Sequence, residues 1–279
     1  MRSSAYNPGR CNPSEGRGAG CMTFCIGMKC DEGLLAIADT RITSGTEFST
    51  AKKISVHPLH GGTMFVAASG LRSVRDKTLT YLEEAIAEKE GSVSKLYQAA
   101  NLLADQIRRV RDEDGAWLDR SGLTFDIHCI LGGQLEGDAT HRLFHLYPEG
   151  NWVEVGSGTP YIIIGESSYG KALLDRVWRH DRPLSEALTA GLLSFDATRI
   201  SVSDVDPPVD VVLYRSGSFE MHEQRFDAGA LRPLSIYWNN AMIEAAARAE
   251  PIVTKMFERL EHSPTASTRD IPGSAGEGR

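Results

Sequence analysis

The order of short apolar runs and longer helical patterns constrains the fold of this chain more than any other feature. Apolar runs of strand length occur in blocks, and the first two, "TFCIGMK" and "GLLAIAD", are separated by turn-type residues. Apolar residues at helical spacing then fill pairs of segments, at 71–89, 93–112, 168–179 and 184–197, and a last segment at about 234–261. Hairpin-linked strands in blocks, alternating with helix pairs, favour antiparallel sheets with helices on their outer faces.

The chain is expected to form one layered α+β domain. Residues 23–262 carry a continuous globular pattern without a linker rich in Pro, Gly or Ser. Residues 1–22 and 263–279 contain almost nothing that could be buried, so both segments are predicted to be disordered. The simplest packing of the strand blocks is a core of two sheets between two layers of helices.

Net charge and hydropathy exclude two classes of partner. The formal net charge is −7, whereas general nucleic-acid binding requires a basic surface. No apolar run reaches the length of a membrane span, and the first 20 residues lack the apolar centre of a secretory signal. We therefore expect a cytoplasmic protein that binds neither nucleic acid nor membrane.

Cysteines and histidines raise the question of a metal site, and their spacing argues against one. Four of the five cysteines fall within residues 11–30, but they lack the Cys-x-x-Cys unit of common zinc sites. They are expected to act as small buried apolar residues. His141 and His145 flank Leu143 and are expected on a polar, solvated face of a strand. The sequence therefore predicts no metal and no cofactor.

Three polar residues lie at the ends of the first predicted strands. Thr23 begins the first apolar run, Asp39 ends the second and Lys53 enters the third. A threonine hydroxyl is a weak nucleophile unless a base takes its proton. If Thr23 were the first residue, its own α-amino group, with a pKa of about 8, could be that base. Lys53, held charged by Asp39, would stabilise the alkoxide, and this set predicts covalent acyl transfer.

Longer stretches around these residues resemble a known family. The segment "TFCIGMKCDEGLLAIADTRITSGTEFSTAKKI" is similar to the amino terminus of proteasome β-type subunits, and "AASGLRSVRD" resembles the glycine turn that follows it there. "IGESSYGKALLDRV" at 164–177 and "SFDATRISVSDVDPPVDVVLY" at 194–214 resemble the bacterial ancestral β-subunit (Anbu) family most closely. The resemblance covers about residues 22–261.

The resemblance implies the four-layer αββα fold of N-terminal nucleophile hydrolases, in agreement with the layered pattern. It implies that Thr23 is the nucleophile and that Asp39 and Lys53 are its charge partners. Gly70 would donate its backbone N–H to the oxyanion, a donor typically worth ~3 kcal/mol of transition-state stabilisation. Ala67 and Ala68 would face the pocket for the residue whose bond is cut, and their small size predicts a roomy or apolar pocket.

Supporting residues follow the bacterial relatives in part. Glu166 stands after Gly165 where proteasome subunits commonly have a serine, and the bacterial relatives resemble this chain in having Glu there. Near the second catalytic loop, the family usually has an Asp and a Ser three residues apart. Here Ser201 and Asp204 stand at roughly those places in reversed order, or Ser203 occupies one of them with a shift in register. These residues are assigned to the hydrogen-bond network around Thr23.

The segment before Thr23 decides whether the amine base exists. In the bacterial relatives the gene begins with Met-Thr, and removal of the methionine exposes the nucleophile. Residues 1–22 are expected to be an expression leader, a consequence of a misassigned start, or a propeptide cut between Met22 and Thr23. With these residues attached the α-amino group is an amide, and the enzyme is predicted to be inert.

The resemblance implies a threonine peptidase that hydrolyses peptide bonds inside a ring or open helical ring of identical subunits. Peptides or unfolded proteins would be its substrates, and whether an unfoldase feeds the chamber is left open. Two alternatives remain at this point. One is a ring-forming structural subunit with a weak or inactive site. The other is an N-terminal nucleophile amidase that acts on small amides.

Overall fold

A computed structural model describes residues 23–44, 47–89 and 91–263 of the chain. The chain divides into two compact units, one ending at Arg232 and one beginning at Pro233. The first unit, here called the sandwich unit, contains all the described strands and every described helix except most of the last one.

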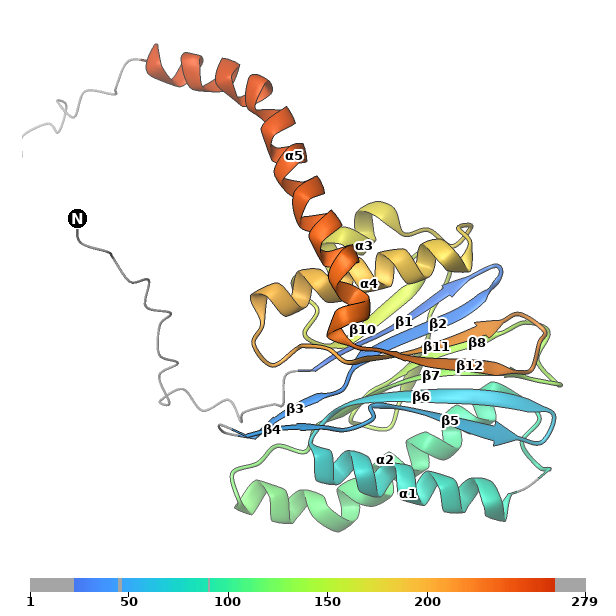
Figure 1. Ribbon diagram of the computed structural model, residues 1–279. Helices are drawn as coiled ribbons and strands as arrows, with labels where there is room; N and C mark the ends of the chain where they lie inside the picture. The colour runs from blue at the N-terminus through green and yellow to red at the C-terminus, as the bar shows by residue number, and fades with distance from the viewer. Residues whose placement is uncertain (1–22, 45–46, 90, 264–279) are drawn as a thin grey trace, which may run out of the picture. The chain divides into compact units, whose positions relative to one another are not determined.

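Two five-stranded antiparallel sheets form the centre of the sandwich unit (Figure 1). The first sheet has the order β10-β1-β2-β11-β12, and the second has the order β5-β6-β7-β8-β9. The first sheet comprises β1 (Phe24–Cys30), β2 (Gly33–Asp39), β10 (Tyr161–Gly165), β11 (Val209–Arg215) and β12 (Met221–Phe226). The second comprises β5 (Ile54–Leu59), β6 (Gly62–Gly70), β7 (Ile127–Leu135), β8 (Arg142–Leu146) and β9 (Trp152–Glu154). A small hairpin joins β3 (Arg41–Ser44) to β4 (Glu47–Thr50).

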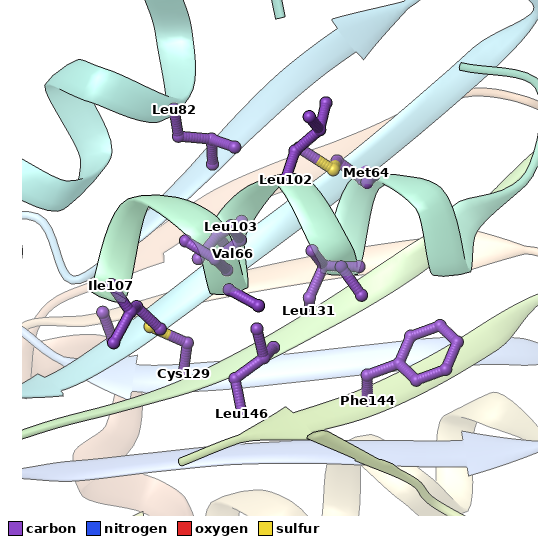
Figure 2. Packing of buried hydrophobic residues seen from close by; sticks show 14 of the residues in the cluster. Met64, Val66, Leu82, Leu102, Leu103, Ile107, Cys129, Leu131, Phe144 and Leu146 are labelled. Atoms are coloured by element: carbon purple, nitrogen blue, oxygen red, sulfur yellow. The ribbon is translucent and has the colours of Figure 1, made fainter. Parts of the chain in front are cut away.

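Helix pairs cover the outer faces of the two sheets. Helices α1 (Arg72–Glu88) and α2 (Leu96–Arg120) pack on the second sheet, where Ile107 of α2 lies next to Cys129 of β7 in a shared apolar cluster (Figure 2). Helices α3 (Lys171–Val177) and α4 (Leu184–Ser201) belong to the first sheet's side, and α4 contacts β1 and β2. This order of layers confirms the expected α+β sandwich.

Alternation of side chains along each strand separates three apolar clusters. On β2, Leu35 and Ile37 join the cluster under α4, while Leu34 and Ala36 join the cluster between the sheets. Both faces of β2 are buried, so its sequence "GLLAIAD" is apolar almost throughout. The layer between the sheets is therefore closed by apolar side chains along the middle of the strands, and its polar groups gather at the strand ends.

Some elements differ from the sequence-based expectation. The hairpin of β3 and β4 was not expected, because its sequences "RITS" and "EFST" lack an apolar alternation. Helix α2 continues to Arg120, since Arg109 pairs with Glu113 on its surface and Leu118 packs on the core beyond the glycine of "DEDG". Helix α5 (Ala228–Glu261) begins earlier than expected, because the Asp227 carboxylate accepts a hydrogen bond from the backbone N–H of Ala230.

The second unit, from Pro233 onward, is helical as far as Glu261 in the described residues and contains Pro251 within the helix. Large apolar side chains are exposed along it, namely Ile236, Tyr237, Met242, Ile243, Ile252, Val253, Met256, Phe257 and Leu260. No described helix in either unit is long and apolar enough to cross a membrane. The predicted leader 1–22 and most of the predicted tail 263–279 lie outside the described residues.

Candidate active site

Three strand ends converge at one edge of the sandwich unit. Thr23 immediately precedes β1, and Asp39 is the last residue of the antiparallel neighbour β2. Lys53 immediately precedes β5, which belongs to the other sheet. All three side chains are buried, with relative exposures of 2 % for Thr23, 0 % for Asp39 and 4 % for Lys53. The structure therefore brings together the three residues that the sequence predicts as catalytic.

The Asp39 carboxylate is the centre of this group. Its Oδ1 accepts hydrogen bonds from Thr23 Oγ1 at 2.9 Å and from the backbone N–H of Phe24 at 2.9 Å. Lys53 Nζ donates to Oδ1 and Oδ2, each at 2.8 Å, and the N–H of Arg41 donates to Oδ2 at 3.2 Å. Thr23 Oγ1 and Lys53 Nζ thus share one acceptor oxygen, which fixes the hydroxyl next to an ammonium group.

Burial shapes the electrostatics of this group. Burial raises the pKa of the Asp39 carboxyl above its ordinary value, and the Lys53 ammonium and the other hydrogen-bond donors oppose that rise. Burial also raises the pKa of the neighbouring Cys25 thiol to about 12, so this thiol stays neutral near pH 7. The Cys25 side chain is fully buried, whereas Thr23 lines a small pocket, so Thr23 is the better placed nucleophile of the two.

The end of β10 holds the backbone of Thr23 in place. The N–H of Glu166 donates to the carbonyl oxygen of Thr23 at 2.7 Å. Gly165 has φ +83°, and a Cβ at this position would lie 2.0 Å from the same oxygen. Only glycine fits this close approach. The Glu166 carboxylate accepts a hydrogen bond from the N–H of Ser168 at 2.8 Å, so its side chain orders its own loop.

A small pocket opens beside the Thr23 hydroxyl. Its lining consists of Thr23, Lys53, Ala68, Ser69, Gly70, Arg72 and Arg75. Gly70 ends β6 with φ +122°, and a Cβ there would lie 2.4 Å from the carbonyl oxygen of Asp126. Ala68 lines this pocket, whereas Ala67 belongs to the apolar cluster between the sheets. Successive residues of a strand face opposite sides, so the two alanines cannot share one pocket.

The loop after α4 reaches the site through residues that the sequence analysis did not single out. The Pro208 carbonyl accepts hydrogen bonds from the N–H of Thr40 at 3.0 Å and from its Oγ1 at 2.9 Å. Arg41 Nη1 lies 3.0 Å from Asp206 Oδ2. A backbone carbonyl leaves no sequence signal, although an Arg two residues after Asp39 could have suggested an ion pair.

The residues predicted in this loop lie elsewhere. Ser201 is the exposed last residue of α4, Ser203 is exposed and Asp204 is half-buried. None of the three makes a hydrogen bond with Thr23, Asp39 or Lys53 among the described residues. The supporting role of these three residues remains a prediction, and no hydrogen bond among the described residues supports it.

The expectation of a solvated face for His141 and His145 is wrong, because both side chains are buried. A ring nitrogen of His141 lies 2.8 Å from the carbonyl oxygen of Cys30, and the ring of His145 stacks on that of His128. Within the described residues, no three His, Cys, Asp or Glu side chains are grouped so that they could hold a metal ion.

Three solved structures that are similar to this chain bear the name Anbu. A mutant of Anbu from Hyphomicrobium sp. strain MC1 superposes with a TM-score of 0.75 at 32% identity, over 82% of this chain and 99% of that one. Anbu from Yersinia bercovieri gives a TM-score of 0.74 at 32% identity, over 81% and 96%. A structure described as the helical assembly of the Anbu complex from Pseudomonas aeruginosa gives 0.72 at 25% identity, over 88% and 99%.

No family model and no curated protein matches the sequence. The structural matches nevertheless extend over four-fifths or more of this chain and almost the whole of each relative. Two of these relatives are 32% identical to this chain over that length. The chain therefore belongs to the Anbu family, the ancestral β-subunits with a proteasome-like N-terminal nucleophile hydrolase fold.

Proposed function

We propose that this protein is a proteasome-type threonine peptidase that hydrolyses peptide bonds through Thr23 in a self-assembled oligomer. The observation that carries the proposal is the shared acceptor oxygen: Asp39 Oδ1 binds both Thr23 Oγ1 and Lys53 Nζ in a buried setting. The Lys53 ammonium group, held by Asp39 next to the hydroxyl, places hydrogen-bond donors and a local positive pole where an alkoxide develops.

The mechanism begins once Thr23 is the first residue. Its Oγ1 attacks the carbonyl carbon of the scissile bond, and the hydroxyl proton passes to the free α-amino nitrogen of Thr23. The charge of Lys53 lowers the pKa of that amine from about 8, so more of it is unprotonated near pH 7. Asp39 keeps Lys53 in position through two hydrogen bonds.

The later steps use the same groups. Negative charge develops on the carbonyl oxygen, and the N–H of Gly70 is assigned to it because Gly70 lines the pocket beside Thr23. The leaving amine takes the proton from the α-amino group as the C–N bond breaks. Water then attacks the resulting ester on Thr23 and gives a proton to the α-amino group, which passes it to Thr23 Oγ1 as the C–Oγ1 bond breaks and the acid product leaves.

Self-assembly is proposed from two observations. The Pseudomonas aeruginosa relative is described as a helical assembly. The second unit of this chain exposes large apolar side chains such as Tyr237, Ile243 and Met256, and exposed apolar patches mark protein–protein contacts. A cytoplasmic location and a peptide or unfolded-protein substrate complete the proposal.

Preparations that begin at Thr23, confirmed by intact mass, should hydrolyse a panel of fluorogenic peptides, and the same chain with residues 1–22 retained should not. Thr23→Ala should abolish turnover, while Thr23→Ser should retain part of it. Thr63→Ala is a matched control, since Thr63 is also a buried threonine but lies at the opposite end of β6. Unchanged hydrolysis by Thr23→Ala would overturn the mechanism.

A β-lactone or epoxyketone probe separates the proposal from its two alternatives. A covalent adduct on Thr23 with peptide turnover supports the peptidase. An assembled protein that never reacts with either probe is the structural subunit with an inactive site. An adduct accompanied by turnover of small acyl-amides but not of peptides identifies the small-amide amidase.

A further inference from the structure

Two arginines form part of the wall of the pocket beside Thr23. Arg72 is the first residue of α1 and Arg75 the fourth, so a spacing of three places both on one side of the helix. Both line the same pocket as Thr23, Lys53 and Gly70. Only Leu71 separates the predicted oxyanion glycine, Gly70, from Arg72, so the chain passes directly from the end of β6 into this pair.

Arg75 is unusually buried for a guanidinium, with a relative exposure of 6 %. Its Nε and Nη2 donate to the same oxygen, Asp76 Oδ1, at 2.9 and 2.7 Å. The other oxygen, Asp76 Oδ2, accepts a hydrogen bond from Arg72 Nε at 3.3 Å. Among the described residues, no acceptor binds Nη1 of Arg75, so one donor edge of the buried guanidinium is left for another group.

The charges around the pocket do not balance. Asp76 is the one carboxylate that pairs with Arg72 and Arg75 in the described part of the chain. The charge of Lys53 is already matched by Asp39. The buried thiols of Cys25 and Cys129 cannot compensate, because burial raises the pKa of each to about 12. The pocket therefore carries an excess positive charge in a poorly solvated place, where an anion binds more strongly than in water.

We propose that this pocket selects substrates with a carboxylate, supplied by a Glu or Asp side chain on the residue whose carbonyl Thr23 attacks. Arg75 is the specificity-determining residue and binds that carboxylate through its free edge, while Arg72, which is exposed, contributes charge at the rim. This inference rests on the proposed function and adds the substrate class to it. A pocket that binds a carboxylate takes the place of the roomy or apolar pocket expected from Ala67 and Ala68.

Matched substrates measure the selectivity. Acetyl-capped tetrapeptides with a fluorogenic amide leaving group should differ only in the last residue, Glu or Gln, which have nearly the same shape. The protein beginning at Thr23 should cleave the Glu peptide with a kcat/KM roughly 10- to 100-fold higher, as one charge-assisted hydrogen bond provides. Equal rates for the two peptides, or faster cleavage of Gln, would overturn the proposal.

Three variants assign the effect to Arg75. Arg75→Met should remove the preference for Glu while the Gln peptide is still cleaved. Asp76→Asn alters an exposed side chain and removes the competing carboxylate, so the preference for Glu should increase. Arg182→Met removes an exposed arginine of the α3–α4 side and should leave the preference for Glu over Gln unchanged. A preference that survives Arg75→Met, or falls in Asp76→Asn, contradicts the assignment.

Binding to Thr23→Ala, measured by calorimetry, keeps the inference testable apart from catalysis. Tetrapeptides ending in Glu amide should bind more tightly than those ending in Gln amide. A Gln peptide with a free terminal carboxylate shows whether the pocket prefers the chain end instead. No adduct on Thr23 with any probe is a failure of the proposed function. No difference between Glu and Gln amides in binding is a failure of this inference.

Discussion

The two ends of the layer between the sheets hold buried polar groups of different kinds. At the end where β1 begins, an ionised pair, Asp39 and Lys53, is surrounded by donors. At the end where β1 finishes, Gln134 and Tyr214 form a neutral cluster: Tyr214 Oη donates to Gln134 Oε1 at 2.9 Å, and the N–H of Gly217 donates to the same oxygen at 3.0 Å. The middle of the layer is apolar.

The difference between the two ends distinguishes polar groups that serve the fold from an ion pair that we assign to catalysis. Neutral groups satisfy their hydrogen bonds at small net cost, so the Gln134 and Tyr214 cluster closes its end of the layer as any fold requires. A buried ion pair is costly to desolvate and is seldom the most stable solution for a core. The pair of Asp39 and Lys53 is therefore better explained by the charge it presents to Thr23 than by the stability it adds.

The largest effect is expected for Lys53→Met. This change leaves the Asp39 carboxylate buried without its cation, at a cost of about 3–5 kcal/mol in the free energy of unfolding, and removes hydrolysis. Lys52→Met is the matched control, because the neighbouring Lys52 is half-exposed and should cost less than ~1 kcal/mol. Urea unfolding and peptide turnover measure both effects.

A second change tests whether charge or stability matters at this end. The double variant Asp39→Leu with Lys53→Met replaces the pair by apolar groups and should recover most of the lost stability without recovering any turnover. Recovery of activity would show that the pair serves the fold alone, and the contrast between the two ends would disappear.

The next largest effect is expected for Gly165→Ala. The new Cβ would lie 2.0 Å from the Thr23 carbonyl oxygen, so the nucleophile is displaced and turnover falls in addition to stability. Gly217→Ala, at the neutral end, introduces the same left-handed strain, with φ +74° and no atom within 4 Å. It should cost about 1–2 kcal/mol and leave kcat/KM unchanged. Equal losses for the two variants would contradict the contrast.

The strand ends of the site could be predicted from sequence because each follows from a local pattern. The buried run "GLLAIAD" fixes Asp39 at the end of a central strand, and apolar runs on either side place Thr23 and Lys53 at strand starts. Thr23, Asp39 and Lys53 meet in the structure as expected, while their catalytic roles remain a prediction.

Other features depend on tertiary contacts that a single sequence does not contain. Arg75 is buried because α1 packs directly on β6. In the sequence, the polar residues at the start of α1 have the spacing of a solvated helix start, so they do not reveal this burial. His141 is buried because its ring meets the carbonyl of Cys30, more than a hundred residues earlier. The role of Pro208 is carried by a backbone oxygen, which every residue possesses.

Tyr214→Phe tests the neutral end with a smaller effect. Removing the hydroxyl takes one donor from Gln134 Oε1 and should cost about 1 kcal/mol, because the N–H of Gly217 still satisfies that oxygen. Turnover should equal that of the unsubstituted protein. A fall in kcat/KM larger than the fall in stability would mean that the neutral end communicates with the site.

The buried histidines predict how stability depends on pH. Burial, assisted by the neighbouring His128, lowers the pKa of His145 from 6.5 to about 4. Between these values the unfolded chain binds more protons, so the free energy of unfolding falls as the pH drops from about 6.5 to about 4 and levels off below. His145→Gln should flatten this part of the profile, measured by urea unfolding at each pH. An unchanged slope would assign the protons to other groups.

The smallest effect is expected for Glu186→Gln on the surface of α4. Glu186 pairs with Arg182 at 3.7 Å, and both side chains are about half-exposed. Water screens this pair, so the loss should be about 0.3–0.5 kcal/mol, roughly a tenth of that for Lys53→Met. Both variants remove one charge from one ion pair, and burial is what differs between them. If the two losses were similar, burial would not explain the energy of the Asp39 and Lys53 pair, and the reason for assigning that pair to catalysis would be lost.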